Sequence, residues 1–393
     1  MTATVREHLN VQPNLVWLEA APKPRGKSKT AALRRQSAAA TAQQQQQREP
    51  PFGLLEWLGD DSNSTAWSHF PLVARTSASQ MERAMRSQLK WGPIDCLICI
   101  SPEMDSSKLA CHAAARVLQP KLIVVLLHRA QVFGRNTCWF LKKPPAPQQL
   151  WALAPHVALA AVNSQRMHGM DTVDWALPVA PFTPSTTCAS KSCLRGFAIQ
   201  GTLRRWSTLG ASGLARNFSG LWPQMLHAGD AAVHLNITVL GRGERAELRV
   251  PPVLNSRVTF QSGLPYMEFW EEIYTSYALL PLFGNNWYLS MRISSTVLAS
   301  LTTCVPIIAT REFLKVYSFF RPEHVFQQEP GEDEVGAMLR VLRMDEAVIM
   351  AKRRALCELR QQLGQKAARL LLRGLAEAVT GYDAGCSAAS AAG

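Results

Sequence analysis

Two continuous apolar runs in the first half of the chain constrain its fold more than any other feature. Residues 94–100 (IDCLICI) and 121–128 (KLIVVLLH) predict strands, and residues 106–118 between them have helical periodicity behind a serine cap. Residues 155–164 (PHVALAAVNS) predict a third strand. Strands that are apolar on both faces are typical of parallel sheets covered by helices. These runs therefore predict an α/β domain with a parallel sheet.

The second half of the chain repeats the alternation of strands and helices. Strands are predicted at residues 195–201, 234–243, 257–263, 277–283 and 305–310, and helices at 211–227, 266–276, 294–303 and 311–320. This order is that of a doubly wound domain. A long amphipathic helix is predicted at residues 345–379. A ligand of two such domains is expected in the cleft at the carboxyl ends of their strands.

Changes in composition predict the domain boundaries. We expect a disordered, low-complexity segment (1–50), a first α/β domain (51–183), a linker (184–193), a second α/β domain (194–330), C-terminal helices (331–380) and a disordered tail (381–393). A segment like 22–50, with its Ala run and five consecutive Gln, cannot bury enough apolar surface to order itself. Residues 14–20 (NLVWLEA) before it are either a first strand with a long insertion after it or a stray segment.

The chain is basic, with 42 Lys and Arg against 29 Asp and Glu and a net charge of +13, of which residues 1–48 supply +6. A basic balance favours an anionic partner, either nucleic acid or a phosphorylated small molecule. The predicted C-terminal helix contributes a row of cations: Arg353, Arg354, Arg360, Lys366, Arg369 and Arg373. We interpret this row as the solvated face of a helix that packs across both domains. No nucleic-acid-binding motif accompanies it, so nucleic acid is not an expected partner.

Nine cysteines in 393 residues indicate reduced thiols and a reducing compartment. Cys96 and Cys99 have C-x-x-C spacing but fall on a predicted strand, where they point to opposite faces and belong to the core. No apolar stretch approaches the roughly 20 residues of a membrane span. We expect an intracellular protein, cytoplasmic or organellar. The Arg- and Ser-rich start is compatible with a transit segment or with a plain tail.

Four motifs in the second half occur together in order and spacing. They are FAIQG with Arg204 and Arg205 behind it, LGRG (240–243), PYMEFWEEIY (265–274) and RISSTVLASLTTCVPIIAT (292–310). Over residues 194–320 this set resembles the donor-binding domain of GT-B glycosyltransferases. The resemblance implies two Rossmann-like domains facing a cleft, a nucleotide sugar (UDP or GDP sugar) as donor, and no metal or further cofactor. The acceptor could be a glycan, a lipid, a protein or a small molecule.

The donor site implied by this resemblance contains glycines, arginines and hydroxyl groups. Its candidates are Gly201, Arg204, Arg205, Gly241, Gly243, Arg292, Ser294, Ser295 and Thr296. Arginines behind a strand-ending glycine can form paired, charge-assisted bonds to diphosphate oxygens. The N–H groups at the start of a helix also attract phosphate. The alternatives are a turn glycine with solvated arginines, and a serine that only caps its helix.

The chain departs from the GT-B pattern at one motif. Many retaining members carry a Glu-x₇-Glu pair before and within the donor helix, and alignment on CVPIIA puts Met291 and Ala299 at those two positions. This chain therefore belongs either to a divergent branch with a serine-based donor loop or to a branch without activity.

Catalytic candidates for the acceptor side lie at the carboxyl ends of the first domain's strands. His128 ends its strand and could act as a general base for an acceptor hydroxyl, because its ordinary pKa is near neutrality. Glu103 and Asp105 could serve instead or orient His128. The alternative for His128 is a satisfied polar residue at a strand end. The leading hypothesis is sugar transfer; the rivals are a catalytically silent GT-B-like scaffold or binding protein, and a nucleotide-sugar epimerase.

Overall fold

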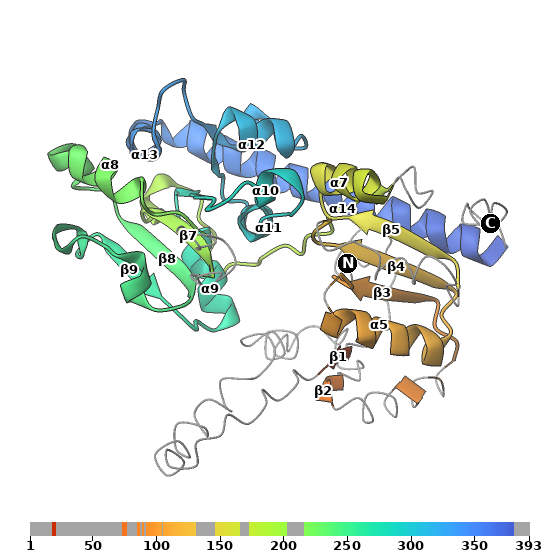
Figure 1. The fold of residues 1–393 in the computed structure, drawn as a ribbon. Helices are drawn as coiled ribbons and strands as arrows, with labels where there is room; N and C mark the ends of the chain where they lie inside the picture. The colour runs from red at the N-terminus through yellow and green to blue at the C-terminus, as the bar shows by residue number, and fades with distance from the viewer. Residues whose placement is uncertain are drawn as a thin grey trace, which may run out of the picture.

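The computed structural model describes residues 18–20, 73–76, 85–86, 89, 92–103, 105–130, 146–165, 173–202 and 216–380. Arg204, Arg205, most of the low-complexity segment and the tail beyond residue 380 lie outside these ranges. The described chain forms two α/β units, and one long helix, α14, runs beside both of them (Figure 1). Among the described helices, none combines the length and the apolar character needed to cross a membrane.

The first unit is built on a four-stranded sheet with the order β3–β4–β5–β6 and all neighbours parallel. Its strands are β3 (Cys96–Ile100), β4 (Leu122–Leu127), β5 (Gln148–Ala152) and β6 (Asp174–Trp175). Every residue of β4 is buried, as expected of a central strand covered on both faces. Helix α5 (Asp105–Leu118) connects β3 to β4. The apolar runs thus predicted strands β3 and β4 correctly.

The prediction of a strand at residues 155–164 is wrong. These residues form helix α7 (Pro155–Gln165), and the third strand is β5, which precedes it. Buried residues here follow the helical spacing i, i+3, i+4, i+7: Ala154, Val157, Ala158 and Ala161. Alanine favours helix, and a proline is well placed at the first helical position. An apolar run of this length is compatible with a strand or a helix, and its Ala-rich composition favours the helix.

A short pair of strands answers the question that residues 14–20 left open. β1 (Leu18–Ala20) pairs in parallel with β2 (Val73–Thr76), which lies more than 50 residues further along the chain. The segment is therefore a strand with a long insertion after it, and it contacts α5.

The second unit is doubly wound. Its sheet has the order β10–β7–β8–β9, and a parallel bridge between Leu279 and Ile307 continues it toward the pair β11–β12. The strands are β7 (Phe197–Thr202), β8 (Ile237–Arg242), β9 (Val258–Gln261), β10 (Ala278–Leu279), β11 (Ile308–Ala309) and β12 (Phe326–Gln327). Strand order therefore reverses between β7 and β10. In open α/β sheets, ligands bind at the carboxyl ends of strands at this switch point.

Helices cover this second sheet, and two further helices, α13 and α14, end the described chain. They are α8 (Leu221–His227), α9 (Tyr266–Tyr274), α10 (Trp287–Ser290), α11 (Ser295–Thr303), α12 (Arg311–Val316), α13 (Glu334–Arg343) and α14 (Glu346–Thr380). Short 3₁₀ turns are η3 (Lys191–Cys193), η5 (Gly229–Ala232), η6 (Arg245–Leu248), η7 (Pro252–Leu254) and η8 (Pro322–His324). The predicted architecture of two parallel α/β units with a long C-terminal helix is confirmed.

Helix α8 begins later than the sequence predicted. Residues 216–220 are not helical, and 211–215 lie outside the described residues. The side chain of Asn217 accepts hydrogen bonds from the backbone N–H (3.0 Å) and hydroxyl (2.6 Å) of Ser219, which is an Asx turn. Arg216 itself forms an antiparallel bridge with Phe283. The polar pair at 217 and 219 thus offers the backbone an alternative to helix.

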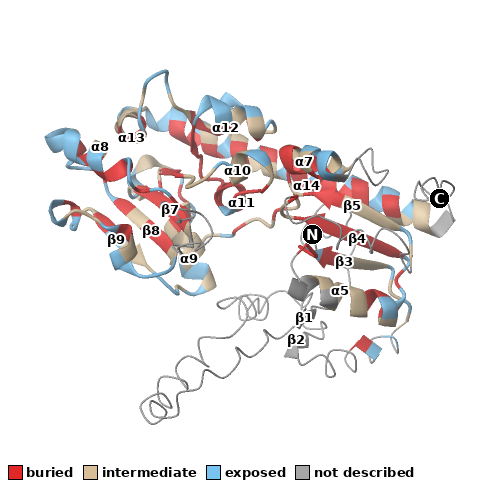
Figure 2. Cartoon of the chain, in the orientation of Figure 1, coloured by how far each residue is buried: buried red, intermediate tan, exposed pale blue. Residues whose placement is uncertain are grey.

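Helix α14 joins the two units through buried contacts. Its last turns pack Ala367, Leu370 and Leu371 against β4 and β5, and red, buried segments run along α14 in Figure 2. The interpretation of its cations as a solvated face is wrong for Arg353, which is buried and donates to the carbonyls of Tyr274 (2.7 Å) and Ser276 (3.2 Å) at the end of α9. A cation there satisfies carbonyls that a helix end leaves unpaired.

The expectation of reduced cysteines is wrong for four of them. Cys188 is disulfide-bonded to Cys193, and Cys304 to Cys357. The second bond links the C-cap of α11 to α14. Sequence spacing could not show this pairing, because residues 53 apart meet only in the folded chain. Cys96 and Cys99 are free thiols of β3 that belong to different clusters on the two faces of the sheet, as predicted.

Candidate functional site

The switch point between β7 and β10 is occupied by a buried arginine that sequence reasoning missed. The Arg216 side chain donates from Nε to the carbonyl of Gln200 on β7 (2.9 Å) and from Nη2 to the hydroxyl of Thr296 on α11 (2.8 Å). Its guanidinium lies 5.8 Å from the ring centre of Phe283 and 5.5 Å from that of Tyr288. Arg216 therefore ties together the end of β7 and the start of α11, the two segments expected to share the donor site.

The charge of Arg216 has no anionic counterpart among the residues that the structure describes. The residue is only 2% exposed, and its Nη1 atom is buried without a hydrogen-bond partner. Residues 203–215, which directly precede Arg216 in the sequence, contain no Asp or Glu that could neutralise it. Burial lowers the pKa of Arg216, although a guanidinium stays protonated in proteins. A buried cation of this kind is costly unless something pairs with it.

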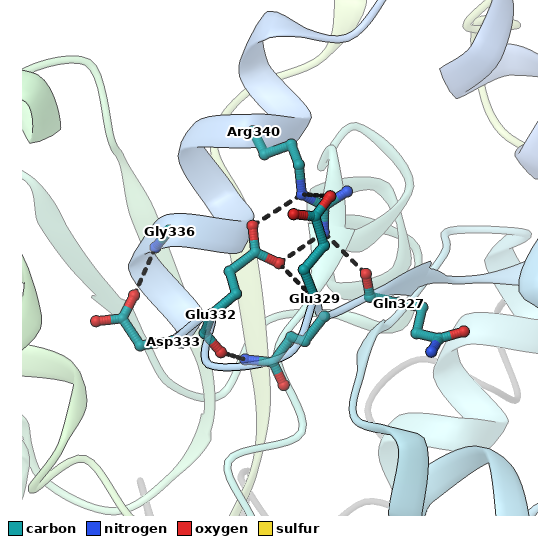
Figure 3. Close-up of polar contacts among 7 residues, drawn as sticks. Gln327, Glu329, Glu332, Asp333, Gly336 and Arg340 are labelled. Carbon is teal, nitrogen blue, oxygen red and sulfur yellow. Dashed lines mark hydrogen bonds and ion pairs between the residues drawn. The ribbon is translucent and has the colours of Figure 1, made fainter.

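Arg340 shows how a structural arginine of this protein is held. It binds Glu332 through Nε (2.8 Å) and Nη2 (2.7 Å), and Nη2 also donates to the carbonyl of Gln327 (Figure 3). The same corner contains Asp333, whose carboxylate caps α13 by accepting from the N–H of Gly336. Arg340 is thus neutralised, whereas the guanidinium of Arg216 has no carboxylate partner among the described residues and its Nη1 has no hydrogen-bond partner.

Two of the predicted glycines make room for this arrangement. Gly201 has φ +149°, and a Cβ added to it would lie 3.0 Å from Nε of Arg216. A Cβ on Gly241 would clash with the carbonyl oxygen of Gly201. Gly241 therefore serves the close approach of β7 and β8. Gly243 is exposed just after β8.

The hydroxyl groups at the start of α11 divide into internal and exposed ones. Ser294 is fully buried and accepts a hydrogen bond from the N–H of Thr296 (3.2 Å), so it caps the helix. Thr296 is also fully buried, and its hydroxyl accepts from Arg216. Ser295 is the exposed member of the three. The capping alternative thus describes Ser294, and Ser295 is the hydroxyl that a ligand could reach.

The loop before α11 is held from beneath by Tyr317. The Tyr317 hydroxyl donates to the carbonyl of Tyr288 (2.7 Å) and accepts from the N–H of Ser294 (3.1 Å). Arg292, in the same loop, places its guanidinium 4.2 Å from the ring centre of Trp287. His156 on α7 of the first unit contacts the carbonyl of Arg292 through Nε2 (2.9 Å). The geometry of this loop therefore depends on both units.

On the first unit, Glu103 is a buried carboxyl close after the end of β3. It is 5% exposed; its Oε1 accepts from the backbone N–H groups of His128 and Arg129, both at 3.2 Å, and its Oε2 is buried without a partner. Burial raises the pKa of Glu103 to about 7, although the backbone hydrogen bonds and Arg129 oppose this. A carboxyl poised near neutrality at the end of a strand is a functional candidate.

The other two catalytic candidates differ from Glu103. Burial lowers the pKa of His128, so its ring is neutral near pH 7. Asp105 is the first residue of α5, and its side chain lies outside the description.

The candidates from the two units meet along one backbone contact. The N–H of Ile293 donates to the carbonyl of His128 (3.2 Å), and the N–H of Ala130 donates to the carbonyl of Met291 (2.9 Å). The loop after β4, whose backbone N–H groups donate to Glu103, therefore lies beside the loop before α11. Within the described residues, no cluster of three or more His, Cys, Asp or Glu side chains could hold a metal ion.

One feature of the sequence could have singled out Arg216. It is the only Lys or Arg between residues 206 and 241, and the one acid of that stretch, Asp230, lies 14 residues further on. A lone arginine there has few partners nearby along the chain. The prediction of a helix over residues 211–227 did not single it out.

Comparison with known proteins gives structural likenesses alone. No protein-family model matches the sequence, and no curated protein matches it. Alr3699/HepE of Anabaena, solved with UDP-glucose, is similar over 78% of this chain and 86% of its own, at 12% identity and a TM-score of 0.48. AviGT4, a glycosyltransferase involved in avilamycin A biosynthesis, is similar over 77% and 91% (12% identity, TM-score 0.46).

A protein described as a putative UDP-N-acetylglucosamine 2-epimerase, from Listeria monocytogenes, is similar over 80% of this chain and 83% of its own, at 10% identity and a TM-score of 0.42. At such identities and TM-scores, these likenesses assign neither a family nor an activity to this chain.

Proposed function

We propose that this chain is a glycosyltransferase that moves a sugar from a nucleotide-sugar donor to the hydroxyl group of an acceptor. The observation that carries the proposal is Arg216: a buried guanidinium at the switch point that has no carboxylate partner among the described residues, with an unpaired Nη1, beside the start of α11. A nucleoside diphosphate supplies the missing negative charge. A helix N-terminus of about half a positive charge and one arginine together match two phosphates better than either does alone.

Each group has a role in the proposed reaction. Arg216 and the N-terminus of α11, where Ser295 is exposed, bind the diphosphate and stabilise the charge that develops on it as the bond to the sugar breaks. Glu103 accepts the proton of the acceptor hydroxyl, whose oxygen forms the new bond to the sugar. His128 is the alternative base. The donor is a substrate, and the proposal includes no metal or further cofactor. Arg204 and Arg205 remain candidates for the same diphosphate.

A binding experiment with a matched control tests the donor site. UDP, GDP and their glucose conjugates are titrated into the full chain by calorimetry, for the wild type, Arg216→Met and Arg340→Met. We expect one of the nucleotides to bind the wild type and Arg340→Met equally, and Arg216→Met at least tenfold more weakly. Release of free sugar from the bound donor then measures turnover. Equal binding to all three proteins would remove the donor site from Arg216.

A catalytically silent binding protein is the second candidate, and one observation favours it. Ala299, where retaining relatives would carry a carboxylate, is fully buried in α11, and Met291 precedes the loop without a charge. A chain that binds UDP or GDP at Arg216 but releases no sugar with any acceptor would support this reading. An epimerase would instead convert the donor sugar without any acceptor.

A further inference from the structure

One side chain of the first unit reaches the loop before α11. His156, in the first turn of α7, is buried, and its Nε2 atom lies 2.9 Å from the carbonyl oxygen of Arg292. A carbonyl oxygen only accepts hydrogen bonds, so Nε2 carries the proton and donates it. Helix α7 also packs against α10 of the second unit, and the two helices are neighbours in Figure 1. The loop is therefore tied to the other unit by a directed bond from one side chain.

The second ring nitrogen of His156 indicates that the residue is not there for packing alone. Its Nδ1 atom is buried and has no hydrogen-bond partner within the described ranges, which is unfavourable for a polar atom. The ring packs edge-on against Tyr317, with 4.7 Å between the ring centres. A phenyl ring would make the same contact without burying an unpaired nitrogen. Burial lowers the pKa of His156, so its ring is neutral near pH 7. The bond donated by Nε2 is what distinguishes histidine from an apolar ring at this position.

The carbonyl that His156 holds lies between two segments that position Arg216. After it along the chain, Ser294 caps α11, and Thr296 in the first turn of that helix accepts from Nη2 of Arg216 (2.8 Å). Before it, α10 carries Tyr288, whose ring centre lies 5.5 Å from the same guanidinium. A shift of the loop would therefore change the surroundings of Arg216 from both sides.

We propose that His156 is a positioning residue of the donor site, and that its Nε2–H holds the loop before α11 where Arg216 and the start of α11 can bind the nucleotide. The inference rests on the proposed function for the identity of the ligand, and on the contacts above for the hold on the loop. His156 acts through Arg216 and α11 and supplies no catalytic group. Loss of its bond lowers the fraction of protein in the arrangement competent to bind, and the apparent affinity falls by the same fraction.

Hydrogen exchange of the full chain without ligand tests the hold on the loop. His156→Phe keeps a ring and removes the donor, whereas His156→Gln restores an N–H group at a similar reach. The control is Asn163→Ala, at an exposed position of the same helix. We expect the amides of residues 284–296 to exchange about tenfold faster in His156→Phe, and those of β8 and α13 to exchange as in the wild type. His156→Gln should recover most of the protection, and Asn163→Ala should lose none.

Calorimetry with UDP and GDP on the same variants tests the consequence for the donor site. His156→Phe should bind the nucleotide about tenfold more weakly than the wild type, and His156→Gln should recover most of the affinity. Added to Arg216→Met, the His156→Phe change should weaken binding by no more than about twofold, because residues that act through one another are not additive.

The outcomes separate this proposal from the proposed function. Unchanged exchange of residues 284–296 in His156→Phe would overturn the positioning role, and so would faster exchange throughout the chain, which indicates a purely structural residue. His156→Gln that behaves like His156→Phe would also overturn it. Failure of UDP and GDP to bind the wild type would instead overturn the proposed function, and the exchange data would still decide whether His156 holds the loop. If His156→Phe does not fold, His156→Ala takes its place with the same outcomes.

Discussion

Replacing Arg216 with methionine separates a binding role from a structural one, because the two predict opposite results. Methionine is flexible and polarisable, and it can fill the space beside the rings of Phe283 and Tyr288. The change removes a buried charge and the hydrogen bonds to Gln200 and Thr296. Its effect on stability is the balance of these two losses.

The balance is small because the two contributions have opposite signs. The carbonyl of Gln200, left unpaired, costs about 1–3 kcal/mol, while the hydroxyl of Thr296 can rotate to another acceptor. Removing a buried charge that lacks a counter-ion returns several kcal/mol, and apolar replacements of buried ionic groups are often neutral or stabilising. We therefore expect the free energy of unfolding of the empty protein to fall by no more than about 2 kcal/mol.

Binding changes much more than stability. Each charge-assisted hydrogen bond lost to the diphosphate costs about 1.5–3 kcal/mol, which corresponds to a loss of roughly 10- to 150-fold in affinity for the nucleotide. Arg216→Lys keeps the charge but not the planar fork, so its affinity should lie between those of the other two proteins.

Two measurements on the full chain check this prediction: urea unfolding followed by tryptophan fluorescence, and calorimetry with UDP and GDP. A variant that loses 4 kcal/mol or more of stability but binds the nucleotide as the wild type does would refute the reasoning. Arg216 would then be a structural residue whose counter-ion lies outside the described ranges.

Three further predictions follow from the same structure. Between pH about 4.5 and about 7 the folded protein should hold a proton on Glu103 that the unfolded chain has lost, so stability should fall as pH rises through this window, and urea titrations of Glu103→Gln should lack this fall. Tyr317→Phe removes the hydroxyl that holds Tyr288 and Ser294, and should cost about 1–3 kcal/mol of stability in urea titrations and weaken nucleotide binding in calorimetry. Deleting residues 1–48 removes β1 and should lower the melting temperature, whereas deleting only residues 25–45 should not; equal melting temperatures would argue against the β1–β2 pair.

The sequence predicted the fold best where local and global signals agree. The runs around β3, β4, β7 and β8 are strands in the structure, and β4, β7 and β8 are central in their sheets. The prediction failed at residues 155–164, because an Ala-rich helix and a buried strand have similarly apolar sequences. The two are distinguished only by which positions are buried in the folded protein. The prediction also missed β5, whose QQLWA sequence has two glutamines at its start. The pairing of β5 depends on its neighbours β4 and β6, which its own sequence does not reveal.

Several candidate site residues were named from the sequence and stay predictions, and Arg216 was missed. Glu103, His128 and the start of α11 could be named because strand ends and helix starts are where ligands bind. Arg216 was not named, since its burial depends on Phe283, Tyr288 and Thr296, which lie more than 60 residues away along the chain. The sequence left open whether Ser294 caps its helix or binds a ligand, and in the structure its hydroxyl caps α11.

The loop before α11 is held in place by residues of both units. Tyr317 holds it from its own unit, while His156 and the backbone of residues 128–130 hold it from the other unit. Arg292 lies in this loop, and Thr296, on the helix that the loop leads into, positions Arg216. A movement that separated the units would therefore break the backbone hydrogen bonds that residues 128 and 130 make to this loop, and would release the loop that leads to the proposed donor site. Conversely, a nucleotide that binds only when this loop is held in place favours the joined arrangement of the two units.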